Sequence, residues 1–227
     1  MKIIFSMVFG CLSLTMNTFG HAGTLGSTPY LDQGFYLGGN IGIHNLNDKE
    51  STTSPPAQHQ LGATGILGGG LLGYDFNVNE QLTLGAEWFM NAVGNSVAAE
   101  QFYTPVSSYT AKMRYEIGGR LLPSYILSPR TRGHLILGYS NGNFTLHDNG
   151  DFGFIDKQFS QNGFQVGLGA MTSLLTYRSF FLRGDLIYTI YAANTALGIG
   201  TQNQSQTYEN NFSTLTGNLT LTYKFSS

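Results

Sequence analysis

Cysteine is almost absent from this sequence, and charged residues are scarce. The one cysteine, Cys11, lies in an apolar run near the amino terminus, so no disulfide can join two parts of the chain. Charged residues make up 11% of the chain, well below the roughly 25% of soluble domains. After that run, no apolar stretch approaches the ~20 residues that a membrane-spanning helix needs. These shortages exclude a disulfide-stapled fold and a helical membrane protein, and they disfavour an ordinary soluble domain.

The amino-terminal region is typical of a secretory signal peptide. A positive charge at Lys2 precedes an apolar run over residues 3–14, and small residues around Ala22 offer a cleavage site. The run is too short to span a membrane as a helix. We therefore predict a signal peptide over residues 1–22 and export from the cytoplasm. A lipid anchor on Cys11 is the alternative, but the preceding Phe9 is bulky for such a site.

The last segment of the chain alternates between two kinds of side chain. From Thr214 to Phe225, one face carries leucine, glycine, tyrosine and phenylalanine, and the other carries threonine, asparagine and lysine. Side chains alternate across a strand with a period of two. About ten residues are enough for a tilted strand to cross a bilayer. The segment therefore predicts a membrane-spanning strand with one apolar face.

Seven earlier segments show a similar pattern, and the connections between them alternate in length. Long polar connections at one end and tight turns at the other are typical of an outer-membrane barrel. The sequence therefore predicts an all-β fold, an eight-stranded antiparallel up-and-down transmembrane β-barrel. The predicted strands are residues 34–44, 62–76, 81–91, 109–126, 133–142, 163–172, 180–191 and 214–225. Long loops are expected at residues 45–60, 92–108, 143–162 and 192–212. The predicted domains are a periplasmic segment over residues 23–33 and a barrel over 34–227.

Alternation alone does not say which face of the barrel meets lipid. A soluble barrel such as a lipocalin would place its apolar face inside and its polar face in water. A water-facing surface would be rich in lysine and glutamate. Here the polar face is mainly glycine, threonine, asparagine and glutamine, which favours a narrow interior. We expect the apolar face to meet lipid, and the lipocalin-like barrel is the alternative.

The charged residues of the predicted strands fall on the polar face. A lysine or arginine at the lipid midplane costs roughly 2–4 kcal/mol, which explains why the apolar face has none. Inside a barrel, each charge needs a partner, because a lone buried ion is costly. We predict an interior ion-pair network that fills the barrel; an ion or proton path, or a catalytic cluster, is the alternative. Its members would be Glu87, Lys112, Arg114, Glu116, Arg120, Arg183, Asp185 and Lys224.

Several segments together resemble the OmpA-like and opacity-protein (porin-family) superfamily of small outer-membrane barrels. The resemblance is carried by residues 34–40, 82–87, 138–140, 182–185 and the closing strand. That strand is also similar to the terminal signal strand of bacterial outer-membrane barrels, although two serines follow its last aromatic residue. The matching residues are Gly217, Leu221, Tyr223 and Phe225. The resemblance implies the bacterial outer membrane, with barrel-assembly machinery and outer-membrane lipid or lipopolysaccharide as partners.

No pattern in the sequence indicates catalysis, a metal site or a cofactor. The five histidines show neither the spacing of a metal site nor a nearby serine in a catalytic arrangement. The net charge of −2 gives no general attraction for nucleic acid. We expect a structural and surface-contact role of the adhesin or immune-contact type, with a host or surface ligand bound through the long loops. A narrow gated ion channel is the first alternative, and a lipid-modifying enzyme is the second.

Overall fold

The computed structural model describes residues 33–53, 56–101, 107–150, 153–174, 177–199 and 205–225. The predicted signal peptide and nearly all of residues 23–33 lie outside this part of the chain. Within it, no helix has the length and apolar character required to cross a bilayer. The strands are β1 (Gly34–Thr53), β2 (Pro56–Asn77), β3 (Leu82–Gln101), β4 (Ser107–Ser128), β5 (Thr131–Gly150), β6 (Gly153–Leu174), β7 (Tyr177–Tyr191), β8 (Asn194–Ile199) and β9 (Ser205–Lys224).

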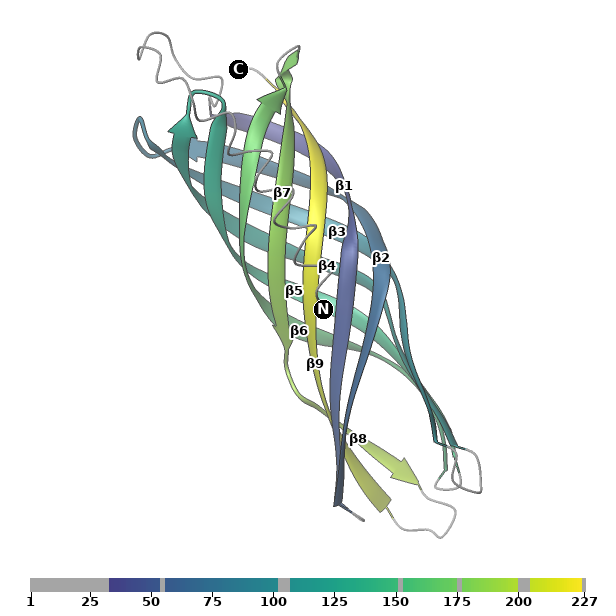
Figure 1. The fold of residues 1–227 in the computed structure, drawn as a ribbon. Helices are drawn as coiled ribbons and strands as arrows, with labels where there is room; N and C mark the ends of the chain where they lie inside the picture. The colour runs from purple at the N-terminus through teal and green to yellow at the C-terminus, as the bar shows by residue number, and fades with distance from the viewer. Residues whose placement is uncertain are drawn as a thin grey trace.

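The strands form one closed antiparallel wall. Each strand from β1 to β7 pairs with the next, β7 pairs with β9, and β9 closes the wall by pairing with β1. β8 follows β7 after Ala192 and Ala193 and pairs with the first part of β9, so it continues the seventh strand of the wall. Figure 1 shows β1 and β9 side by side among steeply tilted strands. The predicted eight-stranded antiparallel barrel is confirmed.

The strand register sets the tilt and the width of the barrel. Following paired residues once around the wall from Tyr36 leads through Glu87, Arg120 and Gln165 and returns to β1 at Leu46, ten residues further along. A barrel closed with such a stagger has strands tilted by roughly 40° to its axis. Eight strands enclose an interior only wide enough for side chains. The lumen is therefore a packed core.

Short turns and long hairpins lie at opposite ends of the barrel. The β2–β3 turn is held by Asn79, whose side-chain oxygen accepts hydrogen bonds from the backbone of Gln81 and Leu82, each at 2.8 Å. In the β4–β5 turn, the Ser128 hydroxyl accepts a hydrogen bond from the backbone of Thr131 at 3.1 Å. We call this end the turn end and the opposite one the hairpin end.

The strands continue far into the segments that were predicted to be long loops. β1 reaches Thr53 and β2 begins at Pro56, and the other predicted loops are likewise mostly paired strand within the described residues. The loop prediction was wrong there because inward apolar side chains continue into these segments. Leu46, Phe144 and Phe212 are all fully buried inside the barrel. Strands of 20–22 residues exceed the ~9–11 needed to cross a bilayer, so the hairpins project beyond it.

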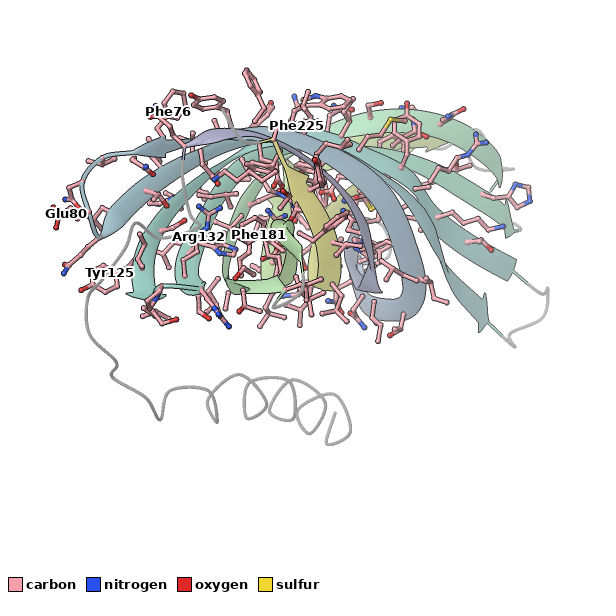
Figure 2. The ribbon with its side chains drawn as sticks, turned by 90° about the horizontal axis from the view of Figure 1, so that it is seen from above. Phe76, Glu80, Tyr125, Arg132, Phe181 and Phe225 are labelled. Carbon is pink, nitrogen blue, oxygen red and sulfur yellow. The ribbon has the colours of Figure 1, made fainter. Side chains whose placement is uncertain are left out.

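The two faces of the wall differ sharply in chemistry. Large apolar side chains such as Ile41, Trp88 and Leu137 are exposed on the outside. Inside, polar side chains such as Asn40 and Thr220 are buried. Viewed from above in Figure 2, Phe76 and Phe225 point away from the wall, whereas Arg132 and Phe181 lie within it. This arrangement is the reverse of a lipocalin-like soluble barrel.

Candidate functional site

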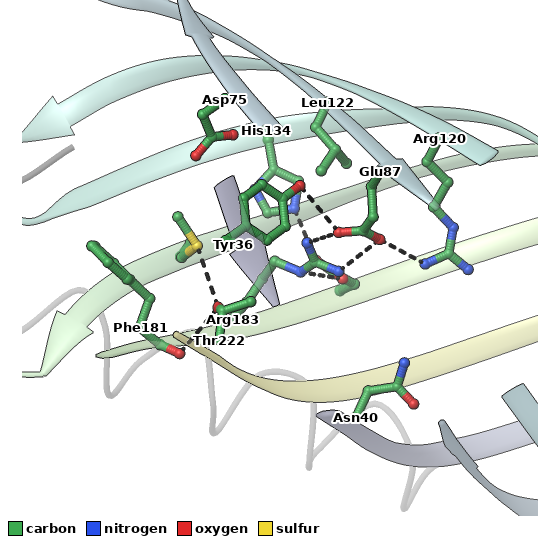
Figure 3. Close-up of polar contacts among 12 residues, drawn as sticks. Tyr36, Asn40, Asp75, Glu87, Arg120, Leu122, His134, Phe181, Arg183 and Thr222 are labelled. Atoms are coloured by element: carbon green, nitrogen blue, oxygen red, sulfur yellow. Dashed lines mark hydrogen bonds and ion pairs between the residues drawn. The ribbon is translucent and has the colours of Figure 1, made fainter. Parts of the chain in front are cut away.

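A buried ion-pair network surrounds Glu87 in the lumen. Both terminal nitrogens of Arg183 donate to the Glu87 carboxylate, the longer contact at 3.2 Å. Arg120 Nη1 lies 3.6 Å from Glu87 Oε1, and the Tyr36 hydroxyl donates to Glu87 Oε2 at 3.4 Å. Figure 3 shows these three side chains converging on Glu87 from different strands. The Glu87 side chain is fully buried, so its charge depends on these partners for stabilisation.

Arg183 links Glu87 to a second carboxylate, Asp185. The Nε of Arg183 lies 2.8 Å from Asp185 Oδ2. The other oxygen, Oδ1, lies 2.8 Å from His134 Nε2. Arg183 and Asp185 are two residues apart on β7, so the alternation of the strand points both of them into the lumen. The guanidinium of Arg183 therefore forms ion pairs with two carboxylates, those of Glu87 and Asp185.

A separate cluster lies at the turn end of the lumen. Asp75 Oδ2 is 2.9 Å from Lys224 Nζ and 2.8 Å from Arg132 Nη2. Asp75 lies on β2, whereas Lys224 lies on β9 and Arg132 on β5, so the cluster spans the width of the barrel. All three side chains are almost fully buried. The cluster therefore connects the closing strand to the opposite part of the wall.

Glu116 is held by neutral hydrogen-bond donors. The Gln165 amide donates to Glu116 Oε1 at 2.7 Å, and the Tyr191 hydroxyl donates to the same oxygen at 2.8 Å. Among the described residues, no cation lies within 4.0 Å of this carboxylate. Gln165 also accepts a hydrogen bond from Arg120 Nε at 2.8 Å. Gln165 thus joins Glu116 to the network around Glu87.

The charges of the lumen nearly balance. Buried cations of the described residues are Arg120, Arg132, Arg183 and Lys224, and buried carboxylates are Asp48, Asp75, Glu87, Glu116 and Asp185. A lumen close to neutral offers little selectivity for an ion of one sign. Removing one partner of a buried pair leaves an uncompensated charge and typically costs about 3–5 kcal/mol. The partners of each buried charge therefore matter for the stability of the wall.

Six of the eight residues predicted for the network face the lumen. Glu87 and Arg120 are direct register partners on β3 and β4, and they form an ion pair as just described. Arg183 pairs with Glu87 and with Asp185. Lys224 pairs with Asp75, which lies on β2 on the other side of the closing seam between β9 and β1. Glu116 is buried beside the network as a hydrogen-bond acceptor.

Lys112 and Arg114 were placed wrongly, because both are exposed on the outside of the barrel. The reason is a β-bulge in β4. The pairing with β5 passes directly from Met113 to Tyr115, so Arg114 is an extra residue without a partner in that ladder. A bulge shifts the alternation by one residue. Met113 therefore faces inward and Tyr115 outward, and simple alternation counted from Glu116 fails beyond this point.

Several lumen residues that contact the predicted set or its partners were not predicted from the sequence, among them Tyr36, Arg132 and His134. Tyr36 belongs to the predicted strand 34–44, whose inward face is otherwise glycine, asparagine and histidine, and Arg132 and His134 lie just before and at the start of the predicted strand 133–142. The inward direction of Arg132 and His134 could have been predicted from alternation. Each lies an even number of residues from inward Ile136 and an odd number from outward Leu135. Their partners could not be inferred, since pairing across the lumen depends on the stagger of the whole barrel.

An apolar cluster seals the lumen at the hairpin end. Phe144 stacks on Phe212 with ring centroids 4.6 Å apart, and the edge of Tyr191 packs against Phe144 at 5.1 Å. The remaining buried members come from five strands: Leu46, Leu67, Val93, Ala111, Met113 and Leu146. We call this group the apolar seal. Both the seal and the charged network below it consist of buried side chains, so both help to fill the described lumen.

The described lumen contains one histidine–carboxylate ion pair, between His134 and Asp185. Asp185 is the one side chain of the described residues to which His134 is hydrogen-bonded. This pair is buried inside the wall, away from any substrate in solution or lipid. Within the described part of the chain, no group of three histidine, cysteine or carboxylate residues could hold a metal ion.

The comparison with protein families identifies the class of this barrel. The family model described as outer membrane protein beta-barrel domain matches residues 15–225. The chain therefore belongs to this family, and the superfamily resemblance seen in the sequence is confirmed. The outside of the wall carries a belt of exposed apolar side chains, which includes Ile41, Trp88 and Leu137. Together with this belt, the family membership identifies the protein as a barrel of the bacterial outer membrane, and the belt faces lipid. No curated protein matches the sequence.

Several solved outer-membrane structures are similar to this chain. Neisserial surface protein A shares 16% identity over 84% of this chain and 97% of its own, with a TM-score of 0.47. The attachment invasion locus protein of Yersinia pestis, in complex with the heparin analogue sucrose octasulfate, shares 11% over 82% and 99%, with a TM-score of 0.39. The outer membrane protease OmpT of Escherichia coli shares 13% over 90% and 100%, with a TM-score of 0.44. These identities are too low to transfer a function.

Proposed function

We propose that the protein is a structural barrel of the outer membrane that contacts other molecules at the cell surface through four projecting hairpins. The observation that carries this proposal is the filled lumen, in which the apolar seal lies above the charged network. A barrel whose lumen is filled contacts other molecules through its outer surface and its hairpins. Rigid walls commonly present binding residues on the segments that project from them.

Shortening the hairpins tests the surface-contact role. Lys49 and Gln60 are register partners on β1 and β2, so residues 50–59 can be replaced by Asn-Gly with the wall pairs below left in place. We expect cells carrying variants of this type to lose attachment to their target surface, while unboiled protein still migrates faster than boiled protein on gels. Unchanged attachment after shortening each of the four hairpins in turn would contradict the role.

A narrow gated channel is the second candidate function. It is favoured by the two ion pairs that Glu87 forms, one with Arg120 and one with Arg183. A carboxylate between two cations can break one ion pair and keep the other, as a gate would require. Planar-bilayer recordings separate the two functions. The structural role predicts silence in the wild type and in Glu87→Gln, with small conductance only in Phe144→Ala/Phe212→Ala, which removes the centre of the seal. Wild-type conductance that changes in Glu87→Gln would favour the channel.

We expect no enzymatic activity, and the lipid-modifying enzyme is the least supported function. The burial of the His134–Asp185 pair supports this expectation. Purified folded barrel should leave labelled lipid A and labelled peptides unchanged over many hours. Conversion of either, lost in His134→Gln, would contradict it.

The closing strand also serves as the assembly signal in this proposal. Tyr223 and Phe225 are exposed at the turn end, and their rings pack edge to face with centroids 5.1 Å apart. Tyr223→Ser/Phe225→Ser should lower the amount of folded barrel in cells yet still fold into lipid vesicles in vitro. Tyr139→Ser/Tyr188→Ser, which alters two exposed tyrosines elsewhere, is the control. Equal losses in cells would count against a signal in the closing strand.

A further inference from the structure

The closing seam between β9 and β1 joins the two strands of the wall that lie furthest apart in the sequence. Figure 1 shows them side by side, although β1 begins at Gly34 and β9 ends at Lys224. The other pairings of the wall join strands that are consecutive or nearly consecutive in the sequence. Loop-closure entropy grows with the length of chain between two paired strands. We therefore expect the seam to close last.

The inner side of the seam has little room for side chains. Gly38 and Gly42 face inward on β1, and a Cβ on either of them would collide with β9. Because these glycines provide no side-chain packing, polar side-chain contacts across the seam gain importance. One of them joins His44 and Thr216, which are register partners and whose Nδ1 and Oγ1 atoms lie 2.8 Å apart.

Lys224 reaches across the seam to Asp75 at the turn end. Its Nζ lies 2.9 Å from Asp75 Oδ2, and on this side of the wall only β1 stands between β9 and β2. In the other direction around the wall, β7, β6, β5, β4 and β3 separate the two strands. The Lys224 stem passes beside Gly34, the register partner of Asp75, where a Cβ would lie 3.8 Å from Lys224 Cε. The contact therefore requires β9 to be paired with β1.

Arg132 holds Asp75 without crossing the seam. Its Nη2 lies 2.8 Å from the carboxylate oxygen that Lys224 also contacts, and its Nη1 donates to the Thr83 hydroxyl at 3.3 Å. Asp75, Thr83 and Arg132 lie on β2, β3 and β5, which are connected by successive pairings of neighbouring strands. Asp75 can therefore be in position before β9 arrives at the seam.

We propose that Lys224 and Asp75 form a latch that keeps the closing seam shut. The latch engages only after β9 has paired with β1, so it opposes reopening of the seam and has little effect on the rate of closure. Arg132 is a positioning residue, because it orients the Asp75 carboxylate for Lys224. The latch belongs to the wall and does not depend on the surface-contact role of the hairpins.

Unfolding kinetics of the full barrel in lipid vesicles test the latch. Lys224→Met removes the cation but leaves Asp75 paired with Arg132, so no lone buried carboxylate remains. We expect unfolding in urea to become at least about tenfold faster, because a hydrogen bond to a charged group contributes more than that factor. Refolding should change by less than about twofold, since the contact forms after the transition state.

Two results of these kinetics would overturn the latch. One is an unchanged unfolding rate, and the other is refolding that slows by the factor expected for unfolding, which would place the contact early in folding. Lys224→Gln is expected to give the same kinetics and takes the place of Lys224→Met if that variant does not fold.

A crosslink across the seam distinguishes a latch from general stabilisation. Leu37 and Tyr223 are register partners on β1 and β9, and both are exposed on the outside of the wall. Leu37→Cys/Tyr223→Cys can therefore be joined by a short thiol crosslinker before the barrel is transferred to vesicles. Once the seam is crosslinked, adding Lys224→Met to this cysteine pair should no longer speed unfolding. A faster rate that persists in the crosslinked barrel would overturn the proposal.

Arg120→Met is the matched control for the crosslink. It breaks an ion pair between β3 and β4, which do not border the seam, and it leaves Glu87 paired with Arg183. Its faster unfolding should persist when the seam is crosslinked. If the crosslink removed the effect of Arg120→Met as well, it would be stabilising the whole barrel, and the assignment of Lys224 to the seam would fail.

Discussion

Glu87 lies at the centre of one of the buried charged clusters of the lumen. Its carboxylate is fully buried and forms ion pairs with the guanidinium groups of Arg120 and Arg183. Glu87→Gln keeps the shape of the side chain but leaves excess positive charge in a site without water. We expect the free energy of unfolding to fall by about 3–5 kcal/mol. Urea titration of the barrel in lipid vesicles measures this change.

The exposed carboxylate in the β2–β3 turn provides the control for that experiment. Glu80 has the same chemistry as Glu87 but lies in solvent at the turn end. Glu80→Gln should change the free energy of unfolding by less than about 0.5 kcal/mol. Similar small effects in both variants would show that the ion pairs of the lumen do not support the wall.

Gly73 shows why inward glycines are needed in a barrel this narrow. A Cβ on Gly73 would collide with the ring of Tyr36, its register partner on β1. Gly73→Ala should therefore lower the free energy of unfolding by about 1–3 kcal/mol through overpacking. Gly39→Ala is the control, because its nearest neighbouring atom would lie 3.8 Å away. Adding Tyr36→Leu should restore the stability that Gly73→Ala loses. The steric explanation would be contradicted if Gly39→Ala were as destabilising as Gly73→Ala and if Tyr36→Leu restored nothing.

At the scale of a strand, β4 shows what alternation can and cannot predict. The segment was recognised as a strand, and Glu116 and Arg120 were assigned to the correct face. The bulge at Arg114 could not be predicted, because it arises from pairing with β3 and β5 and leaves no mark in the local pattern. The strand lengths were underestimated for a similar reason. The polar residues of the hairpins have the composition of a loop, and only their pairing with neighbouring strands shows that they are strand.

Thiol labelling tests the reversed phase of β4 beyond the bulge. The one cysteine of the chain lies in the predicted signal peptide, so an introduced cysteine is the only thiol expected in the exported protein. In whole cells, a membrane-impermeant maleimide should label Lys112→Cys and leave Met113→Cys unlabelled. The opposite pattern would mean that the strand keeps the simple alternation and that the bulge is absent.

At the scale of the whole molecule, the sequence was sufficient for the class of fold and insufficient for its interior. Eight alternating segments with unequal connections led to an eight-stranded barrel, because each segment reports its own two faces. The partners of Asp75 and Arg132 lie across the lumen, and only the stagger of the closed wall brings them together. The apolar seal was missed for the same reason, since its members are scattered over seven strands.

The most direct test of the account concerns which side of the wall meets lipid. Nitroxide spin labels can be attached at Leu137→Cys on the outside and at Ser140→Cys in the lumen of β5, in barrels embedded in lipid vesicles. We predict that the label at 137 collides freely with oxygen and hardly at all with a water-soluble nickel complex, whereas the label at 140 meets neither. A label at 137 that is accessible to nickel but not to oxygen would show a water-facing surface and contradict the membrane barrel.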